Sequence, residues 1–310
     1  MIENIRLAFQ GIWGHKLRSV LTMLGIIIGI AAIITIVSTI KGTNEQIKEN
    51  LIGAGNNVVT VKLNQSGYAY DMSWSPVPAG VRVITEQTRR EIEDISGAEK
   101  VSLYTARNYA EQIYYRNSQF NGEIYGIDAH YLSVYGYQVK TGRGFTESDY
   151  KNFRKVALVD TTAVNTLFGG ASPVGKSVDL QGDVFTVVGV VALSDDFTPT
   201  INTLNDYYLY ADTSSGSIYI PSAVWPTAYQ FDEPQNVAIK VANTDVMTTV
   251  GQKAAEILTE NQIVNKESDL DYRSQDMLEQ AQQLQKMSES TNAQLIWIAS
   301  ISLLVGGIGV

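Results

Sequence analysis

An uninterrupted run of uncharged residues near the N-terminus constrains this chain more than any other feature. Residues 19–40 read SVLTMLGIIIGIAAIITIVSTI, which is 22 residues without a charged side chain. As a helix this run would extend about 33 Å, and the hydrocarbon core of a bilayer is about 30 Å thick. A buried core helix is one alternative, but such a helix is rarely apolar on every face. A cleaved signal peptide is another, although its apolar region is typically only about 7–15 residues long. We therefore expect a transmembrane helix over residues 19–40.

The residues around this run indicate its orientation. Three Lys or Arg residues precede it, whereas the two lysines that follow it, Lys41 and Lys48, stand among glutamates. Because Lys and Arg accumulate on the cytoplasmic side, we expect the N-terminus in the cytoplasm. Within residues 1–18, Ile5, Phe9 and Ile12 fall on one face of a helix, which predicts an amphipathic helix on the inner membrane surface. The alternative is that these residues simply begin the membrane helix.

A second apolar run closes the sequence. Residues 295–310, LIWIASISLLVGGIGV, contain no charge over 16 residues. A helix of this length extends only about 24 Å, which is short of the hydrocarbon core. We expect residues 292–310 to form an incomplete second transmembrane helix, and the whole protein to be longer.

The region between the two runs is acidic. Residues 42–291 carry 19 of the 23 Lys and Arg residues and 31 of the 32 Asp and Glu residues, so their net charge is 19 − 31 = −12. A nucleic-acid partner is not expected, because phosphate contacts need clustered Lys and Arg. The chain has no cysteine and two histidines, His15 and His130, which argues against thiolate and histidine-rich metal sites. We expect residues 42–291 to form an extracytoplasmic domain.

Strand and helix patterns divide this domain into two parts. Alternating apolar residues predict strands over 57–63 and 237–242, and three- and four-residue spacing predicts helices over 84–95 and 244–261. Helical patterns next to the membrane runs predict a stalk, whose second helix should run unbroken from Ser274 to Val305. We therefore expect residues 41–119 and 235–291 to form a stalk and one α+β subdomain. Residues 120–234, with short strands and glycine turns, form a β-rich insert, including a tyrosine-rich loop over 206–216.

The stretch GASPVGKS, residues 170–177, fits the phosphate-binding pattern G-x-x-x-x-G-K-[ST]. That loop needs a strand before the glycines and a helix after the lysine. Here residues 161–168 predict a short helix closed by a glycine cap, and the segments VDLQG and VFTVVGVV that follow predict strands. The order of elements is the reverse, so we interpret the stretch as a turn before a β-hairpin rather than as an ATP site.

Several segments together resemble MacB-type ABC transporter permeases. These are KLRSVLTMLGIIIGIAAIITIVS at the first apolar run, TLFGGASPVGKSVDLQGDVFTVVGVV, SIYIPSAVW, and SLLVGGIGV in the last run. Their order matches the family over nearly the whole chain. The resemblance implies two transmembrane helices and a helical stalk framing a porter-like α+β subdomain that is interrupted by a β-rich insert.

The resemblance also implies a function. It implies that this chain is a non-catalytic permease half. Family members work as dimers with two ATPase subunits, and the stalk carries movement to the outer domain by mechanotransmission. In the best-known members an ATPase domain precedes the first membrane span in the same chain. Because this sequence begins close to the membrane, we expect the ATPase, with its ATP and magnesium, on a separate chain. The expected partners are that ATPase, a second permease copy or a paired permease, the lipid bilayer of the cell membrane and, for efflux, an adaptor protein.

Other functions stay open at the level of sequence. The same architecture serves lipoprotein release, peptide sensing in antibiotic defence and control of cell-wall hydrolases, and a membrane-anchored sensor without an ATPase is an alternative of another class. We expect no catalytic, cofactor-binding or metal-binding residues in this chain. The acidic pair Asp195 and Asp196 is more typical of a solvated turn than of a metal site.

Overall fold

The computed structural model describes residues 57–193, 215–265 and 269–275, together with ten positions between Val20 and Gly42 and with Trp297. The chain divides into two compact units, one made of Met1–Ile47 with Ala281–Val310 and the other of Lys48–Gln280. The described positions between Val20 and Gly42 are helical. No helix among the described residues is long and apolar enough to cross a bilayer.

Several expected features fall outside the described residues. These are the amphipathic helix over 1–18, most of both expected membrane spans, the stalk from residue 276 to 291, the Asp195–Asp196 pair and nearly all of the tyrosine-rich loop.

Within the larger unit, the described residues 57–275 begin and end in the antiparallel part of one 13-stranded sheet. We call this antiparallel part, with helices α3 and α9, the base lobe. Its main strands lie in the order β13-β1-β12-β3. Their bounds are β1 (Val58–Gln65), β3 (Ala98–Arg107), β12 (Asn236–Val241) and β13 (Leu270–Gln275), and a short strand β2 (Tyr68–Ala69) pairs with the end of β1. Val59, Val61 and Leu63 alternate along β1 and are fully buried, as expected for a strand with one face against a core.

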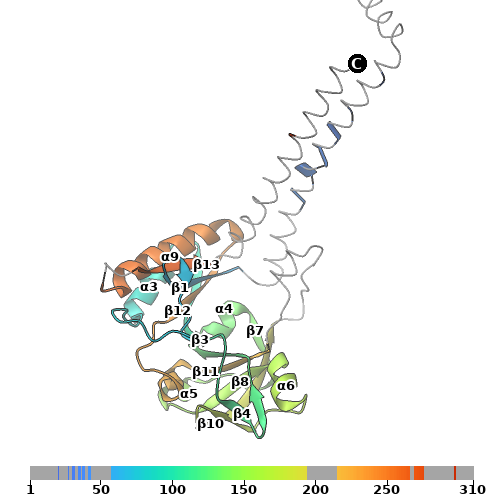
Figure 1. The fold of residues 1–310 in the computed structure, drawn as a ribbon, viewed down its shortest axis with the longest axis vertical. Helices are drawn as coiled ribbons and strands as arrows, with labels where there is room; N and C mark the ends of the chain where they lie inside the picture. The colour runs from blue at the N-terminus through green and yellow to red at the C-terminus, as the bar shows by residue number, and fades with distance from the viewer. Residues whose placement is uncertain are drawn as a thin grey trace, which may run out of the picture. The chain divides into compact units, whose positions relative to one another are not determined.

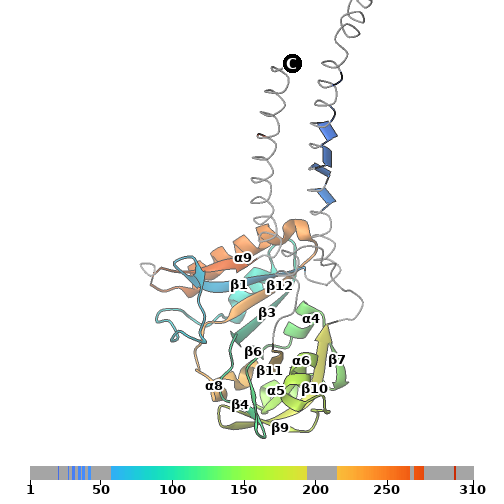
Figure 2. The ribbon, with the colours of Figure 1, turned by 45° about the vertical axis from the view of Figure 1, so that its right-hand side comes forward.

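Two helices cover one face of this sheet. They are α3 (Glu86–Glu93) and α9 (Met247–Gln262), and a 3₁₀ turn η2 (Thr244–Val246) precedes α9 (Figures 1 and 2). Thr85 caps α3, because its hydroxyl oxygen accepts a hydrogen bond from Thr88 N at 3.2 Å. The predicted strands at 57–63 and 237–242 and the predicted helices at 84–95 and 244–261 are confirmed, with bounds that differ by a few residues.

The middle of the chain forms what we call the insert lobe. In this lobe the parallel pairs β6–β11 and β8–β10 stand among antiparallel pairs. Its strands are β4 (Ile113–Tyr115), β5 (Ser118–Phe120), β6 (Glu123–Ile127), β7 (Tyr137–Gly142), β8 (Val156–Asp160), β9 (Ser177–Leu180), β10 (Asp183–Leu193) and β11 (Ser217–Pro221). Its helices are α4 (Tyr131–Tyr135), α5 (Glu147–Lys151), α6 (Thr161–Phe168), η1 (Ser222–Val224) and α8 (Trp225–Ala228).

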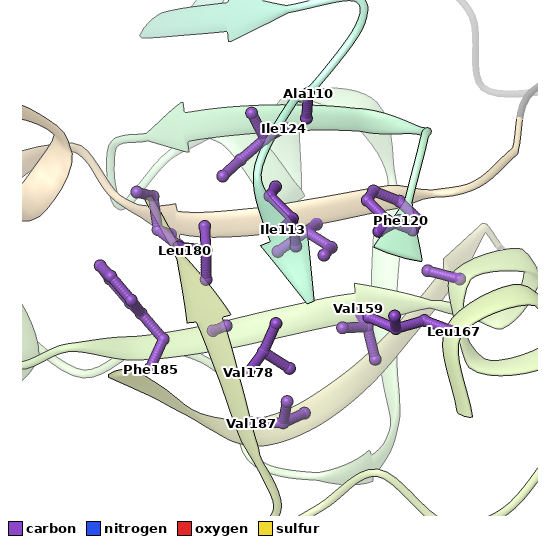
Figure 3. Packing of buried hydrophobic residues seen from close by; sticks show 14 of the residues in the cluster. Ala110, Ile113, Phe120, Ile124, Val159, Leu167, Val178, Leu180, Phe185 and Val187 are labelled. Carbon is purple, nitrogen blue, oxygen red and sulfur yellow. The ribbon is translucent and has the colours of Figure 1, made fainter. Parts of the chain in front are cut away.

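Apolar side chains from distant strands fill the core of the insert lobe. Figure 3 shows Ile113 from β4, Val178 and Leu180 from β9, Val187 from β10 and Leu167 from α6 converging on one another. All five are at most 2% exposed, so this lobe has a close-packed core of its own.

Strand β3 belongs to both lobes. Its residues Ala98–Tyr104 pair with β12, and Tyr104–Arg107 pair with β6. Strands β4 and β5 pair with each other, and β4 pairs with β9. The boundary that the sequence suggested at Phe120 therefore falls at the end of β5, inside the insert lobe.

The expected start of the second stalk helix is wrong. Ser274 and Gln275 belong to strand β13, where they pair with Val61 and Thr60 of β1. Good helix formers predicted a helix there, but Leu270 and Tyr272 alternate as buried residues and place this segment in the sheet. The α+β architecture itself is confirmed for the described residues.

Candidate functional site

The two segments that connect the base lobe to the rest of the chain meet on neighbouring strands. β1 begins at Val58 and β13 ends at Gln275, and antiparallel pairing places Thr60 opposite Gln275. The Thr60 hydroxyl donates to the Gln275 carbonyl oxygen at 3.2 Å. We call residues 57–60 and 273–275 the entry site, because both connections reach the outer domain there.

The beginning of β1 is tied to the next strand. The side-chain amide of Asn57 donates to the carbonyl oxygen of Val241, and Val241 N donates to the Asn57 carbonyl oxygen at 2.9 Å. Val58 is 8% exposed and packs in a core cluster that contains Tyr104 of β3 and Ala238 of β12. A displacement of Asn57 would therefore act on β12 and β3 as well as on β1.

Helix α9 lies directly on the entry site because Gly251 has no side chain. A Cβ atom at Gly251 would lie 2.2 Å from Ser274 Oγ and 2.7 Å from Val59 Cγ1, which is far inside contact distance. The Thr259 hydroxyl also accepts a hydrogen bond from Tyr272 N at 2.9 Å. The helix thus contacts both strands of the entry site through their backbones and side-chain stems, and the three elements should move together.

Beside the entry site, Ser274 Oγ and Asp271 Oδ1 are buried without a hydrogen-bond partner, whereas the charged groups interact with one another. Burial lowers the pKa of Lys62 on β1, while the carboxylates of Glu123 and Asp71 act in the opposite direction. Burial also raises the pKa of Tyr272. Arg273 Nε lies 2.8 Å from Asp271 Oδ2. These interactions fix packing and charge beside the entry site.

The GASPVGKS stretch has the order predicted from sequence. Helix α6 precedes it and is capped by Gly169 in the left-handed conformation, and β9 begins at Ser177. Its amides are engaged within the chain: Gly175 N donates to Val187 O at 2.8 Å and Lys176 N to Pro173 O at 3.0 Å. In a phosphate-binding loop, by contrast, such amides point at the ligand.

The lysine of this stretch is directed at aromatic rings. Lys176 Nζ lies 5.4 Å from the centroid of the Tyr115 ring and 5.7 Å from that of Phe168. Both distances lie within the range of a cation–π interaction. Lys176 therefore packs the loop onto β4 and α6.

Other residues singled out from sequence have local roles where the structure describes them. His130 precedes α4, and its backbone N donates to Asp128 Oδ1 at 2.9 Å. Among the described residues, no group of three or more His, Asp or Glu side chains is arranged to hold a metal ion.

Sequence reasoning missed the entry site. The alternation of Leu270 and Tyr272 was a signal for β13, whereas nothing local to Gly251 announces its contact with a strand that lies nearly two hundred residues earlier.

Comparison with known proteins points to one family. Residues 19–257 match the model of the MacB-like periplasmic core domain. The uncharacterized ABC transporter permease YvrN of Bacillus subtilis (strain 168) is 34% identical over 311 residues, covering 100% of this chain and 74% of that protein. The macrolide export ATP-binding/permease protein MacB of Aggregatibacter actinomycetemcomitans is 29% identical and also covers the whole chain. This chain spans 45% of that MacB, less than half its length.

A solved structure shows the same fold. The periplasmic region of MacB from Actinobacillus actinomycetemcomitans superposes with a TM-score of 0.51 at 20% identity, over 77% of this chain and 97% of that one.

Proposed function

Because this chain belongs to the MacB-like periplasmic core domain family, whose relatives are ABC transporter permeases, we propose that it couples ATP hydrolysis to export by mechanotransmission. In this proposal the chain breaks no bond. A separate ATPase subunit binds ATP and magnesium at the cytoplasmic face, and the membrane helices pass its movement to the outer domain. The substrate is handled outside the membrane.

The observation that carries this proposal is the entry site. Movement of two membrane helices can reorient a domain only if both act on parts of it that are rigidly joined. Here β1 and β13 are neighbours in one ladder, and α9 lies on both strands. A displacement of Asn57 or Gln275 would therefore move the whole base lobe instead of stretching one loop.

The partners follow from the same proposal. The chain would pair with an ABC ATPase subunit and with a second permease, either another copy or a related chain, in the cell membrane, with residues 42–291 outside. The charge of −12 over that region supports an aqueous, extracytoplasmic location. An adaptor protein would be a further partner if the transporter serves efflux.

Substitution of Gly251 tests the transmission step. Gly251→Ala would place a methyl group on Ser274 and Val59, and α9 would have to shift outward, at a cost of roughly 1–3 kcal/mol for an overpacked contact. In the full chain reconstituted with its ATPase, we expect ATP to alter amide hydrogen exchange of β1, β13 and α9. In Gly251→Ala the response of α9 should be lost, while ATP hydrolysis continues.

The neighbouring residue supplies the control. Gln252 is exposed on the same helix, so Gln252→Ala should respond to ATP as the wild type does. An outer domain whose exchange is indifferent to ATP in the wild-type complex would refute the proposal.

A further inference from the structure

The polypeptide passes between the base lobe and the insert lobe at two places. It leaves the base lobe along β3, which ends at Arg107, and returns through residues 229–235, between α8 and β12. The β3–β6 ladder and a core cluster that contains Val58, Tyr219 and Ala238 already join the lobes. A contact between the two crossings adds to these in holding one lobe on the other.

A buried ion pair joins the crossings. Arg107 Nη2 on the outgoing crossing donates to Glu233 Oε1 on the returning one, across 126 residues of sequence. Arg107 is 8% exposed and Glu233 only 3%. Oε1 of Glu233 also accepts from Gln230 N at 3.1 Å, and Oε2 accepts from the indole Nε1 of Trp225 at 2.9 Å. The carboxylate thus has three donors, which is what a buried charge requires.

Aromatic rings hold the arginine in place. Its guanidinium carbon lies 5.5 Å from the centroid of the Trp225 ring and 4.9 Å from that of Tyr229, and these two rings stack on each other at 4.3 Å. Gly126 of β6 makes room for the indole, because a Cβ there would lie 2.5 Å from a Trp225 ring carbon. The pair therefore joins the returning crossing and Trp225 to the end of β3, the strand that both lobes share.

A second brace fixes the outgoing crossing. Asn108, which follows Arg107, donates through its side chain to Asp71 Oδ2 at 3.0 Å and through its backbone N to Ser73 Oγ at 3.1 Å. The ring of Tyr109 stacks on that of Trp74 at 5.7 Å. The loop after β2 thereby holds the crossing to the base lobe.

We propose that Arg107 and Glu233 form a lock that holds the insert lobe in one orientation on the base lobe. Arg107 and Glu233 act as positioning residues. The lock itself does not depend on the proposed function; only its consequence does, which is that movement received at the entry site also moves the insert lobe. Leaving one member of a buried pair without its partner is strongly unfavourable, so loss of the arginine would release the crossings before it unfolded either core.

The test measures the distance between the lobes in the full chain. The sequence has no cysteine, so two can be introduced for spin labels, at Glu256 on α9 and at Val184 on β10, which is 59% exposed. In lipid nanodiscs without ATPase, the wild type should give one narrow distance distribution. Arg107→Met keeps the stem and removes the charge, and the single narrow distance should be lost.

A control variant distinguishes loss of the lock from the general effect of losing an ion pair. Arg143 is itself exposed but pairs with the fully buried Asp149 at 2.7 Å inside the insert lobe, so Arg143→Met leaves a buried carboxylate without this arginine but should keep the narrow distance. Trp225→Phe removes one donor to Glu233 and keeps a ring, and should broaden the distribution less than Arg107→Met.

Amide exchange gives a second reading. Backbone amides of residues 230–233 and of Gln235 should exchange roughly tenfold faster or more in Arg107→Met, because local opening no longer breaks the pair. If circular dichroism shows that Arg107→Met is unfolded, Glu233→Gln and Trp225→Phe take its place in both measurements. A distance as narrow as that of the Arg143→Met control in every folded variant would overturn the lock. Because no ATPase or substrate is present, this result is independent of the proposed transport function.

Discussion

At the scale of single residues, Lys176 shows how context decides the role of a motif. It occupies the lysine position of a phosphate-binding pattern, yet its ammonium group lies over Tyr115 and Phe168 and its backbone N bonds to Pro173. The sequence already indicated this outcome, because the order helix, loop, strand was readable from residues 161–180.

Lys176→Ala tests that role. It should lower the free energy of unfolding by about 1 kcal/mol through loss of a cation–π contact, and leave ATP turnover of the assembled transporter unchanged. Thermal melting and ATP hydrolysis of the reconstituted complex measure the two effects. A collapse of nucleotide turnover in a folded variant would mean that the lysine meets nucleotide after all.

Asp149 predicts a dependence of stability on pH. Burial by itself would raise the pKa of this carboxyl, but hydrogen bonds from Arg143 and Thr146 outweigh it and hold the pKa at about 2. The folded pKa lies below the unfolded value of about 3.9, so the stabilisation is present above pH ~4 and is lost as the pH falls towards 2. Asp149→Asn should lower the melting temperature at pH 7 and weaken its decline in acid.

The control for this prediction is Glu147→Gln. Glu147 pairs with Lys151 on the exposed face of α5, so its loss should leave the melting curve unchanged at either pH. If the melting temperatures of Asp149→Asn and wild type fell equally in acid, another group would control the loss of stability at low pH.

At the scale of elements, local sequence patterns predicted the helices and strands whose residues interact mainly with near neighbours in sequence. Helices α3 and α9 and strand β1 were predicted correctly, because each has a signal that lies within a few consecutive residues. These signals are the cap at Thr85, the apolar spacing of α9 and the alternation in β1. Strand β13 was not predicted, because its partner is β1 and its C-terminal residues are good helix formers. The assignment of Ser274 depended on a ladder more than two hundred residues away in sequence.

A proline at Gln282 tests whether the stalk must be a continuous helix. This residue lies in the segment expected to be helical after β13. Proline would remove a backbone donor and clash with the preceding turn, at a cost of about 3 kcal/mol or more. We expect the partner ATPase to hydrolyse ATP while the ATP-dependent exchange of β1 and β13 disappears. Gln282→Ala is the control. If the ATP-dependent exchange of β1 and β13 were unchanged in Gln282→Pro, the stalk would connect the domain to the membrane without transmitting movement.

At the scale of the whole molecule, composition and charge separated the apolar runs from the acidic domain, and motif order indicated the family. The joint between the lobes was beyond sequence, because Arg107 and Glu233 carry no pattern that pairs them. The sequence also did not reveal that Gly251 allows α9 to pack closely against the entry site. Both features depend on distant segments packing together, which no local periodicity records.

The proposed topology has its own test. Cysteines at Ser215 and Glu256, both exposed, should react with a membrane-impermeant reagent on intact cells. A cysteine within residues 1–18 should react only after lysis. Protection of both outer positions in intact cells would contradict the orientation derived from the Lys and Arg distribution.

The most direct test of the central claim is a distance between the end of the first apolar run and the outer domain. Spin labels at Lys41 and Glu256 in the full chain, reconstituted with its ATPase, report whether nucleotide at the cytoplasmic face moves the domain beyond the membrane. We predict that trapping ATP on a hydrolysis-deficient ATPase shifts this distance in the wild type and leaves it unshifted in Gln282→Pro. A wild-type distance that is the same with and without ATP, in a complex shown to bind the nucleotide, would contradict mechanotransmission by this chain.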